Sequence, residues 1–187
     1  MPRGAELWHA LYGAWRFALA DRNAIHYFDL SHRGTWRSFW AAAYCYPAFL
    51  LERWLEIPAE NVASSGLGHI FLVESIGYVI GWTAFPLAVV ALCRGLGREE
   101  RGFDFITAYN WSIVLQIALF VLIGLLSLLL PDSAAIGLQR LGLIAALIYE
   151  WFIALIAIGA GTWIAGLVVI IDIVLGLLIQ VTVLALY

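Results

Sequence analysis

The chain contains no lysine and little charge of either sign. Only 12% of its 187 residues are charged, all ten basic residues are arginine, and 64% are hydrophobic. Soluble domains are about half apolar and about a quarter charged. The composition therefore excludes a single soluble domain and predicts an integral membrane protein whose surroundings are the lipid bilayer. A formal net charge of −3 also leaves no large basic face for nucleic acid.

Cysteine is scarce, and the common catalytic motifs are missing. Cys45 and Cys93 form no CxxC pair, so we interpret both as small apolar residues. We find no nucleophile elbow, HExxH, P-loop or dinucleotide-binding motif. His26, Asp29 and His32 are close enough in sequence to hold a divalent ion, but such clusters are more often only solvated. We predict no enzyme, no catalytic residue, no metal site and no cofactor beyond bound lipid.

Long apolar segments are abundant. They predict an all-α, polytopic transmembrane bundle of five helices, at about 36–55, 67–93, 105–130, 134–158 and 163–186. Residues 36–187 would form this membrane domain. The uninterrupted apolar part of the first span ends at Leu51 and contains Pro47, so crossing would need Arg37 and Arg53 to reach toward the interfaces. We interpret the mixed-charge segment 98–104 as a cytoplasmic turn.

Residues 1–35 would precede the bundle as an amphipathic helix and a polar connection. Between residues 6 and 20, the apolar side chains of Trp8, Leu11, Tyr12 and Trp15 recur at helical spacing. Such a helix either lies in the membrane interface with its aromatic stripe among the acyl chains or covers the cytoplasmic ends of the bundle. The segment does not resemble a cleaved signal.

The arginines predict the orientation, because short loops rich in Arg stay in the cytoplasm. With a cytoplasmic N-terminus, eight arginines lie inside and only Arg53 and Arg140 lie outside. The C-terminus would then be external, which is periplasmic in a bacterial inner membrane. The same asymmetry disfavours a dual-topology homodimer.

Two carboxylates, Glu150 and Asp172, lie eleven residues on either side of Gly161 in an otherwise apolar hairpin. At about 1.5 Å per residue both acids fall roughly 16 Å from the turn, near the middle of a hydrocarbon layer about 30 Å thick. An ionisable residue at that depth is a candidate functional site. Small residues recur at intervals of four on the same faces, so we expect the acids to meet and to share one proton. Asn110 is the nearest polar residue by depth and is expected to donate to either acid.

Several short stretches resemble the bacterial branch of the Yip1-like membrane proteins. They are residues 28–30 followed by 36–40, the segment from 77–78 to 85–87, and residues 108–111. The resemblance extends over about residues 25–187 and implies five spans with a cytoplasmic N-terminus and a short external C-terminus. The fuller Asp-Leu-Tyr-Gly-Pro signature is absent, since Ser31 and His32 follow Leu30, so trafficking roles do not transfer.

Two functions are consistent with these features. The first is a non-enzymatic accessory or scaffold subunit of a larger membrane complex, bound to a membrane-protein partner or to further copies of itself. The alternative is a small proton- or cation-coupled transporter or channel that uses Glu150 and Asp172. The two differ in whether polar residues line a continuous path through the bundle. The acids also have a purely structural interpretation, in which one stays protonated and joins the hairpin by a hydrogen bond.

Overall fold

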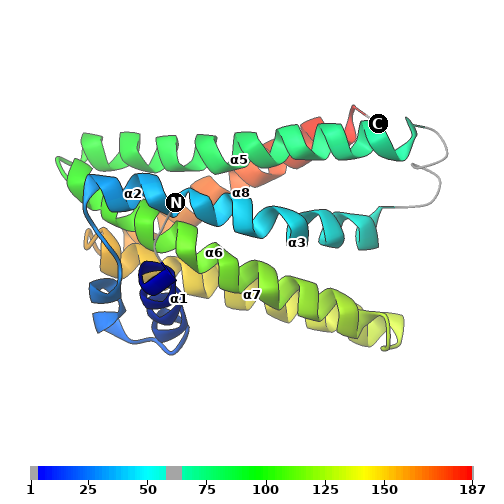
Figure 1. The fold of residues 1–187 in the computed structure, drawn as a ribbon, viewed down its shortest axis with the longest axis horizontal. Coiled ribbons are helices and arrows are strands. Elements are labelled where there is room, and N and C mark those ends of the chain that lie inside the picture. Colours follow the sequence, from blue (N-terminus) through cyan, green and yellow to red (C-terminus); the bar gives the residue numbers. More distant parts are fainter. Residues whose placement is uncertain (1–3, 58–64, 187) are drawn as a thin grey trace.

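A computed structural model describes residues 4–57 and 65–186, and within these ranges the chain is helical (Figure 1). In chain order the elements are α1 (Gly4–Ala18), the 3-10 helix η1 (Arg22–Tyr27), α2 (His32–Ser38), α3 (Trp40–Glu56), α5 (Leu67–Gly95), α6 (Glu99–Ser127), α7 (Asp132–Ala157) and α8 (Thr162–Leu184). The predicted all-α class is confirmed for the described residues.

Four helices, α5 to α8, are long and apolar enough to cross a membrane. The predicted count of five spans is not confirmed, since the described residues contain four such helices. The fifth candidate, α3, has 17 residues and extends about 26 Å, which is less than a hydrocarbon core about 30 Å thick. Phe39 separates α3 from α2, and its helical backbone (φ −65°, ψ −13°) keeps the two helices nearly in line (Figure 1).

Helix α6 is the centre of the bundle. It contacts α1, α2, α3, α5 and α7, and residues 105–112 are all buried. A helix with neighbours on every side buries polar as well as apolar side chains. This position explains why Thr107, Asn110 and Ser112 lie inside the protein.

The segment predicted as a charged turn is largely helical, because α6 begins at Glu99, six residues earlier than expected. Acidic residues in the first turn favour this start, since they face the positive end of the helix dipole. The turn itself is confined to residues 96–98, where Gly97 adopts a left-handed backbone (φ 67°).

The hairpin between α7 and α8 turns where the sequence predicts it. Gly159 (φ 65°) and Gly161 (φ 93°) take backbone conformations that favour glycine. Arg98 donates from Nη1 to the carbonyl oxygen of Gly159 at 2.9 Å, so its guanidinium satisfies the carbonyl end of α7. The turn before α6 and the turn before α8 therefore lie at the same end of the bundle.

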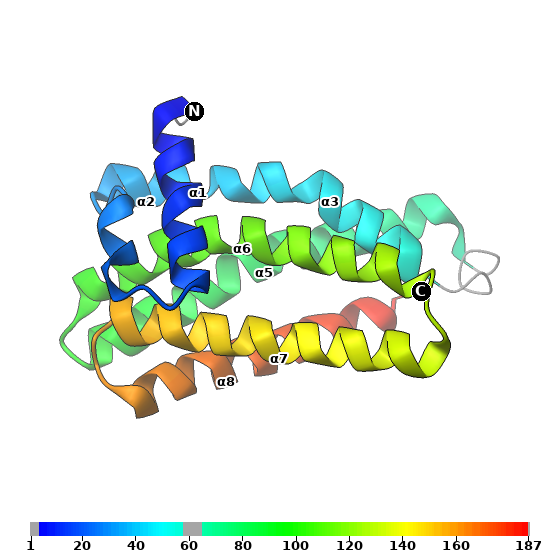
Figure 2. The same ribbon diagram turned by 90° about the horizontal axis from the view of Figure 1, so that it is seen from below.

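Helix α1 crosses the direction of the spans (Figures 1 and 2). It packs through a face of buried small and apolar residues, Ala10, Gly13, Ala14 and Phe17. The hydroxyl of Tyr149 on α7 donates to the Ala14 carbonyl at 2.7 Å. The predicted aromatic stripe faces the other way: Trp8, Tyr12 and Trp15 are exposed, and Leu11 is half-buried.

The junction after α1 is held by Asp21, which caps η1. Its side chain accepts a hydrogen bond from the backbone N–H of Asn23 at 2.9 Å and pairs with Arg16. The Asn23 N–H, and then the Arg16 guanidinium, hold the pKa of Asp21 below its ordinary value. The charged form of Asp21 is therefore the form that stabilises this junction.

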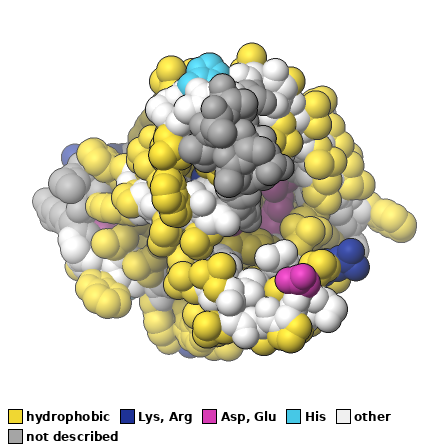
Figure 3. Space-filling view, turned by 90° about the vertical axis from the view of Figure 1, so that its right-hand side faces the viewer, with side chains coloured by type: hydrophobic (Ala, Val, Ile, Leu, Met, Phe, Trp, Pro, Cys, Tyr) yellow, Lys and Arg dark blue, Asp and Glu magenta, His cyan; other side chains and the backbone are white. Residues whose placement is uncertain are grey.

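Large apolar side chains are exposed along the spans, among them Leu87, Leu141 and Ile170. Viewed along its long axis, the bundle shows hydrophobic side chains over much of its outline, with few charged groups (Figure 3). Exposed apolar surface of this extent is unusual in water. Acyl chains of a bilayer would cover it.

Candidate functional site

Glu150 on α7 and Asp172 on α8 lie against each other inside the bundle. Their carboxyl groups are close enough to interact, and Glu150 is only 3% exposed. The glycine turn places them together because each lies about the same number of residues from it. The meeting that the sequence predicts is thus present in the structure.

Two carboxyl groups can form a hydrogen bond only when one carries a proton. Within residues 4–57 and 65–186, no ion pair joins Glu150 or Asp172 to an arginine or a histidine. Glu150 Oε1 is buried and receives no hydrogen bond from an N–H or hydroxyl group of a described residue. Two like charges in such surroundings resist ionising together, so the pair is suited to holding and releasing one proton.

Tyr109, rather than Asn110, donates to the pair. Its hydroxyl lies 3.4 Å from Asp172 Oδ1. Asn110 is fully buried and donates from Nδ2 to Ser38 Oγ at 2.8 Å, while its Oδ1 has no hydrogen-bond partner among the described residues. The expected bond from Asn110 to an acid is therefore replaced by one to α2, because adjacent helical residues point about 100° apart.

A pocket of about 260 Å³ opens beside the pair, between α3, α5, α6 and α8. The predicted face of α8 lines it, through Asp172, Gly176 and Gln180. Glu74 of α5 lines it as well and is only 4% exposed. In the predicted topology Glu74 lies near the outer end of the span at 67–93. The structure places it on the same pocket as Asp172, so this pocket carries acids from both α5 and α8.

The predicted small-residue face of α7 packs within the chain. Gly142, Ala146, Glu150 and Ala154 are all buried. A side chain at Gly142 would meet Ile123 of α6, so the glycine permits close approach of these two helices. This face is therefore occupied by the protein's own α6.

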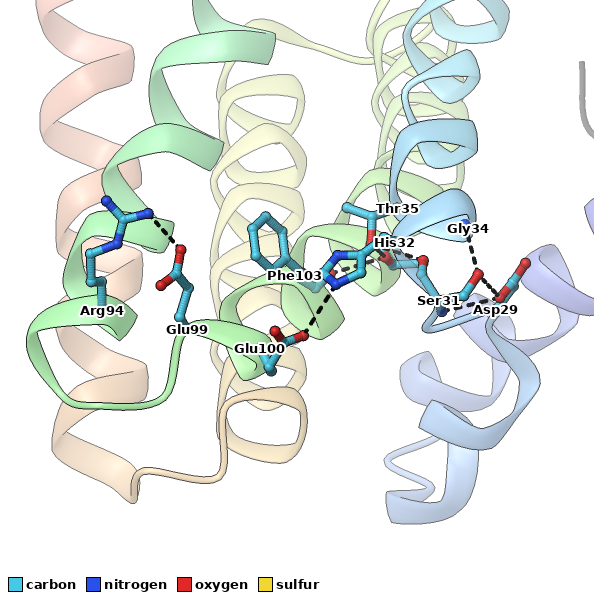
Figure 4. A network of polar contacts seen from close by, with 10 residues as sticks. Asp29, Ser31, His32, Gly34, Thr35, Arg94, Glu99, Glu100 and Phe103 are labelled. Carbon is cyan, nitrogen blue, oxygen red and sulfur yellow. Dashed lines mark hydrogen bonds and ion pairs between the residues drawn. The ribbon is translucent and has the colours of Figure 1, made fainter.

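Asp29 and His32 contact different partners, and His26 is exposed. Asp29 Oδ1 accepts hydrogen bonds from the backbone N–H and the hydroxyl of Ser31, which begins α2. The ring of His32 lies against Phe103, with its Nε2 atom 3.8 Å from Glu100 (Figure 4). Among the described residues, no group of three His, Cys, Asp or Glu is arranged to hold a metal ion.

Comparison with known proteins adds no family to this description. No family model, curated protein or solved structure matches the chain.

Sequence reasoning missed Tyr109 and Glu74. Asn110 was selected by its depth in the span alone. Tyr109 directly precedes it, and the sequence does not show how α6 is rotated about its own axis. Glu74 lies in a long apolar segment, and its relation to α8 depends on how α5 and α8 cross. A buried acid in a span was the one signal that could have included it.

Proposed function

We propose that the protein is a polytopic membrane protein that exchanges a proton for a cation at Glu150 and Asp172. The observation that supports this most is that Asp172, one member of the pair, lines a pocket with a third acid, Glu74, and with Gln180. A purely structural hydrogen bond would need no pocket beside it. Polar groups at more than one depth are what a path for protons or ions requires.

The exchange uses one proton that the two acids share. With one shared proton the pair carries a single negative charge, and Tyr109 donates to its Asp172 side. A cation that enters the pocket stabilises the doubly ionised pair, which releases the proton. When the cation leaves, a proton returns to the pair.

We further propose that α2 and α3 together make the fifth span. From His32 to Glu56 they extend roughly 37 Å, enough to cross the hydrocarbon core. This crossing puts the N-terminus in the cytoplasm and the C-terminus outside, as the arginines predict. The inner-membrane location and the Yip1-like relationship belong to the same proposal and rest on the motifs in the sequence.

Helix α1 is proposed to lie in the cytoplasmic membrane interface. Its buried face packs on the bundle, and Trp8 (75% exposed) and Trp15 (54%) point away from it. Tryptophan and tyrosine favour the headgroup level, and α1 crosses the spans as an interfacial helix should (Figure 2). Both predicted roles, covering the bundle and anchoring to lipid, then belong to different faces of one helix.

The accessory-subunit hypothesis has less support from the geometry. One feature that favoured it was the small-residue face of α7, but this face packs on α6 of the same chain. Native mass spectrometry after mild detergent extraction tests it, since a monomer without a stable partner would count against it.

The exchange is tested in proteoliposomes by imposing a gradient of sodium, potassium or tetramethylammonium in separate runs and following the opposite movement of protons with an enclosed pH dye. A cation gradient is the driving force because one proton exchanged for one monovalent cation moves no net charge. Glu150→Gln should lower the flux to that of protein-free vesicles. Asp132→Asn makes the same chemical change on an exposed residue of α7 and should leave the flux unchanged. Equal flux in wild type and Glu150→Gln would refute the proposed function.

A further inference from the structure

The pocket beside the acid pair carries features that a bare proton site does not need. Its lining combines carboxyl groups with aromatic rings, including Tyr78, Trp82 and Phe85. The ring centroids of Phe85 and Tyr109 are 4.8 Å apart, and those of Tyr78 and Trp82 are 5.9 Å apart. Rings from α5 and α6 thus share the pocket with Asp172 of α8.

A second observation points to a ligand with an N–H or O–H donor. Asn110 is fully buried and lines the pocket. Its Nδ2 is used by Ser38, whereas its Oδ1 has no partner among the described residues. Buried carbonyl oxygens are nearly always hydrogen-bonded in folded proteins, so an unpaired one on a pocket wall favours a bound donor.

We propose that this pocket binds a small organic ammonium ion, with an N–H donated to Asn110 Oδ1, the charge facing Asp172 and the carbon chain against the aromatic rings. Aromatic faces attract ammonium groups in addition to burying their methylenes. The volume of about 260 Å³ is just below the range of about 300–1,000 Å³ for drug-sized ligands. A primary amine with a short alkyl chain fits these dimensions.

This inference rests on the proposed exchange and names its cation. The ammonium ion enters with charge +1 while the pair holds one proton and carries charge −1. The shared proton then leaves to water, and the ammonium ion remains in the pocket, facing Asp172 of the doubly ionised pair. Charge and protons balance, with one proton released for each ammonium ion bound. Glu74, Tyr78 and Tyr109 are the other titratable groups that line the pocket.

The test uses three probes of similar size with the purified full-length protein in lipid nanodiscs: n-butylammonium, tetramethylammonium and n-butanol. Isothermal titration calorimetry in two buffers of different ionisation enthalpy reports both binding and proton release. We expect n-butylammonium to bind and release about one proton, tetramethylammonium to bind more weakly because it lacks an N–H, and n-butanol not to compete. Binding of n-butanol as tight as that of n-butylammonium would show that the pocket binds the alkyl chain and does not recognise the charge, and would overturn the proposal.

Variants then locate the site. Asn110→Leu should weaken n-butylammonium by roughly fivefold to tenfold and leave tetramethylammonium unchanged. Asp172→Asn should weaken both cations and remove the proton release. Thr182→Val changes an α8 residue outside this pocket and serves as the matched control. If Asn110→Leu fails to fold, the ranking of the three probes on wild type still decides the question.

The outcomes separate this inference from the proposed function. Proton flux that depends on Glu150, without binding of either ammonium probe, would retain the exchange and refute the organic cation. Ammonium binding that releases no proton would refute the coupled exchange and retain a cation site.

Discussion

Replacing Gly77 with alanine should separate α5 from α8. A Cβ atom at this position would lie 2.7 Å from Val183 Cγ2 and 3.4 Å from Ile179 Cγ2. Ordinary contacts between such atoms are 3.4–4 Å, so the valine methyl has to move by roughly 0.7 Å or more. Val183 is β-branched and buried, and its χ1 angle has one strongly preferred value in a helix.

Because neither side chain can easily rotate away, the two helices must move apart. Overpacking of this kind costs about 1–3 kcal/mol, and we expect the lower half of that range because a single methyl group causes the closest contact. Gly81 is a matched control one turn along α5. A Cβ there meets only Ile179 Cδ1 at 3.8 Å, and alanine favours the helix by up to about 1 kcal/mol.

The assay is reversible unfolding in mixed micelles of mild detergent and SDS, followed by helical circular dichroism. Gly77→Ala should unfold at a lower SDS fraction than wild type, and Gly81→Ala at the same or a higher one. Equal midpoints for the two variants would show that α5 and α8 are not in close contact at Gly77. Gly77 also lines the pocket, so the separation should loosen ammonium binding as well.

Three further predictions concern the end of the bundle near α1. Arg98→Gln should lower the unfolding free energy by about 1 kcal/mol, measured in the same micelle titration, because the Gly159 carbonyl loses a charged donor; no change would refute the capping role. In the double variant Trp8→Phe and Trp15→Phe, lipids brominated near the headgroup should quench a smaller share of the tryptophan fluorescence than in wild type. Equal quenching in the two proteins would place both side chains away from lipid. The folded-state pKa of Asp21 lies below its ordinary value of 3.8, so its stabilisation is present above that pH and is lost as the pH falls through the folded-state pKa. As the pH falls from 4 to 2, the rate of pepsin cleavage at this junction should therefore rise more in wild type than in Asp21→Asn, whose side chain caps η1 without a charge. The same rise in both proteins would contradict this.

The acid pair could be predicted because its determinants are local in sequence. Glycines in 159–161 require a turn, and the rise of an α-helix converts equal residue counts into equal depths. The face of α8 that carries Asp172, Gly176 and Gln180 follows from the helical period alone. None of these inferences needs knowledge of how the other helices pack.

The rest of the pocket depends on packing between helices that are distant in the chain. Whether Tyr109 or Asn110 points at Asp172 is decided by the rotation of α6, which five neighbouring elements fix together. The sequence offers both residues at the same depth, and selecting the amide over the phenol was wrong for that reason. The place of Glu74 on the pocket also depends on packing, because depth alone does not show which helix an acid faces.

One hydrogen bond connects α1 to α7, the helix that carries Glu150. Tyr149, next to Glu150, donates to the carbonyl of Ala14, 135 residues earlier in the chain. Helix α1 thus contacts the same turn of α7 that carries one member of the acid pair. If the aromatic face of α1 lies in the membrane interface, a change in lipid packing that shifts α1 also pulls on α7 beside Glu150. In the proposed mechanism the pair would then respond to two influences, the cation in the pocket on one side and the interfacial helix on the other.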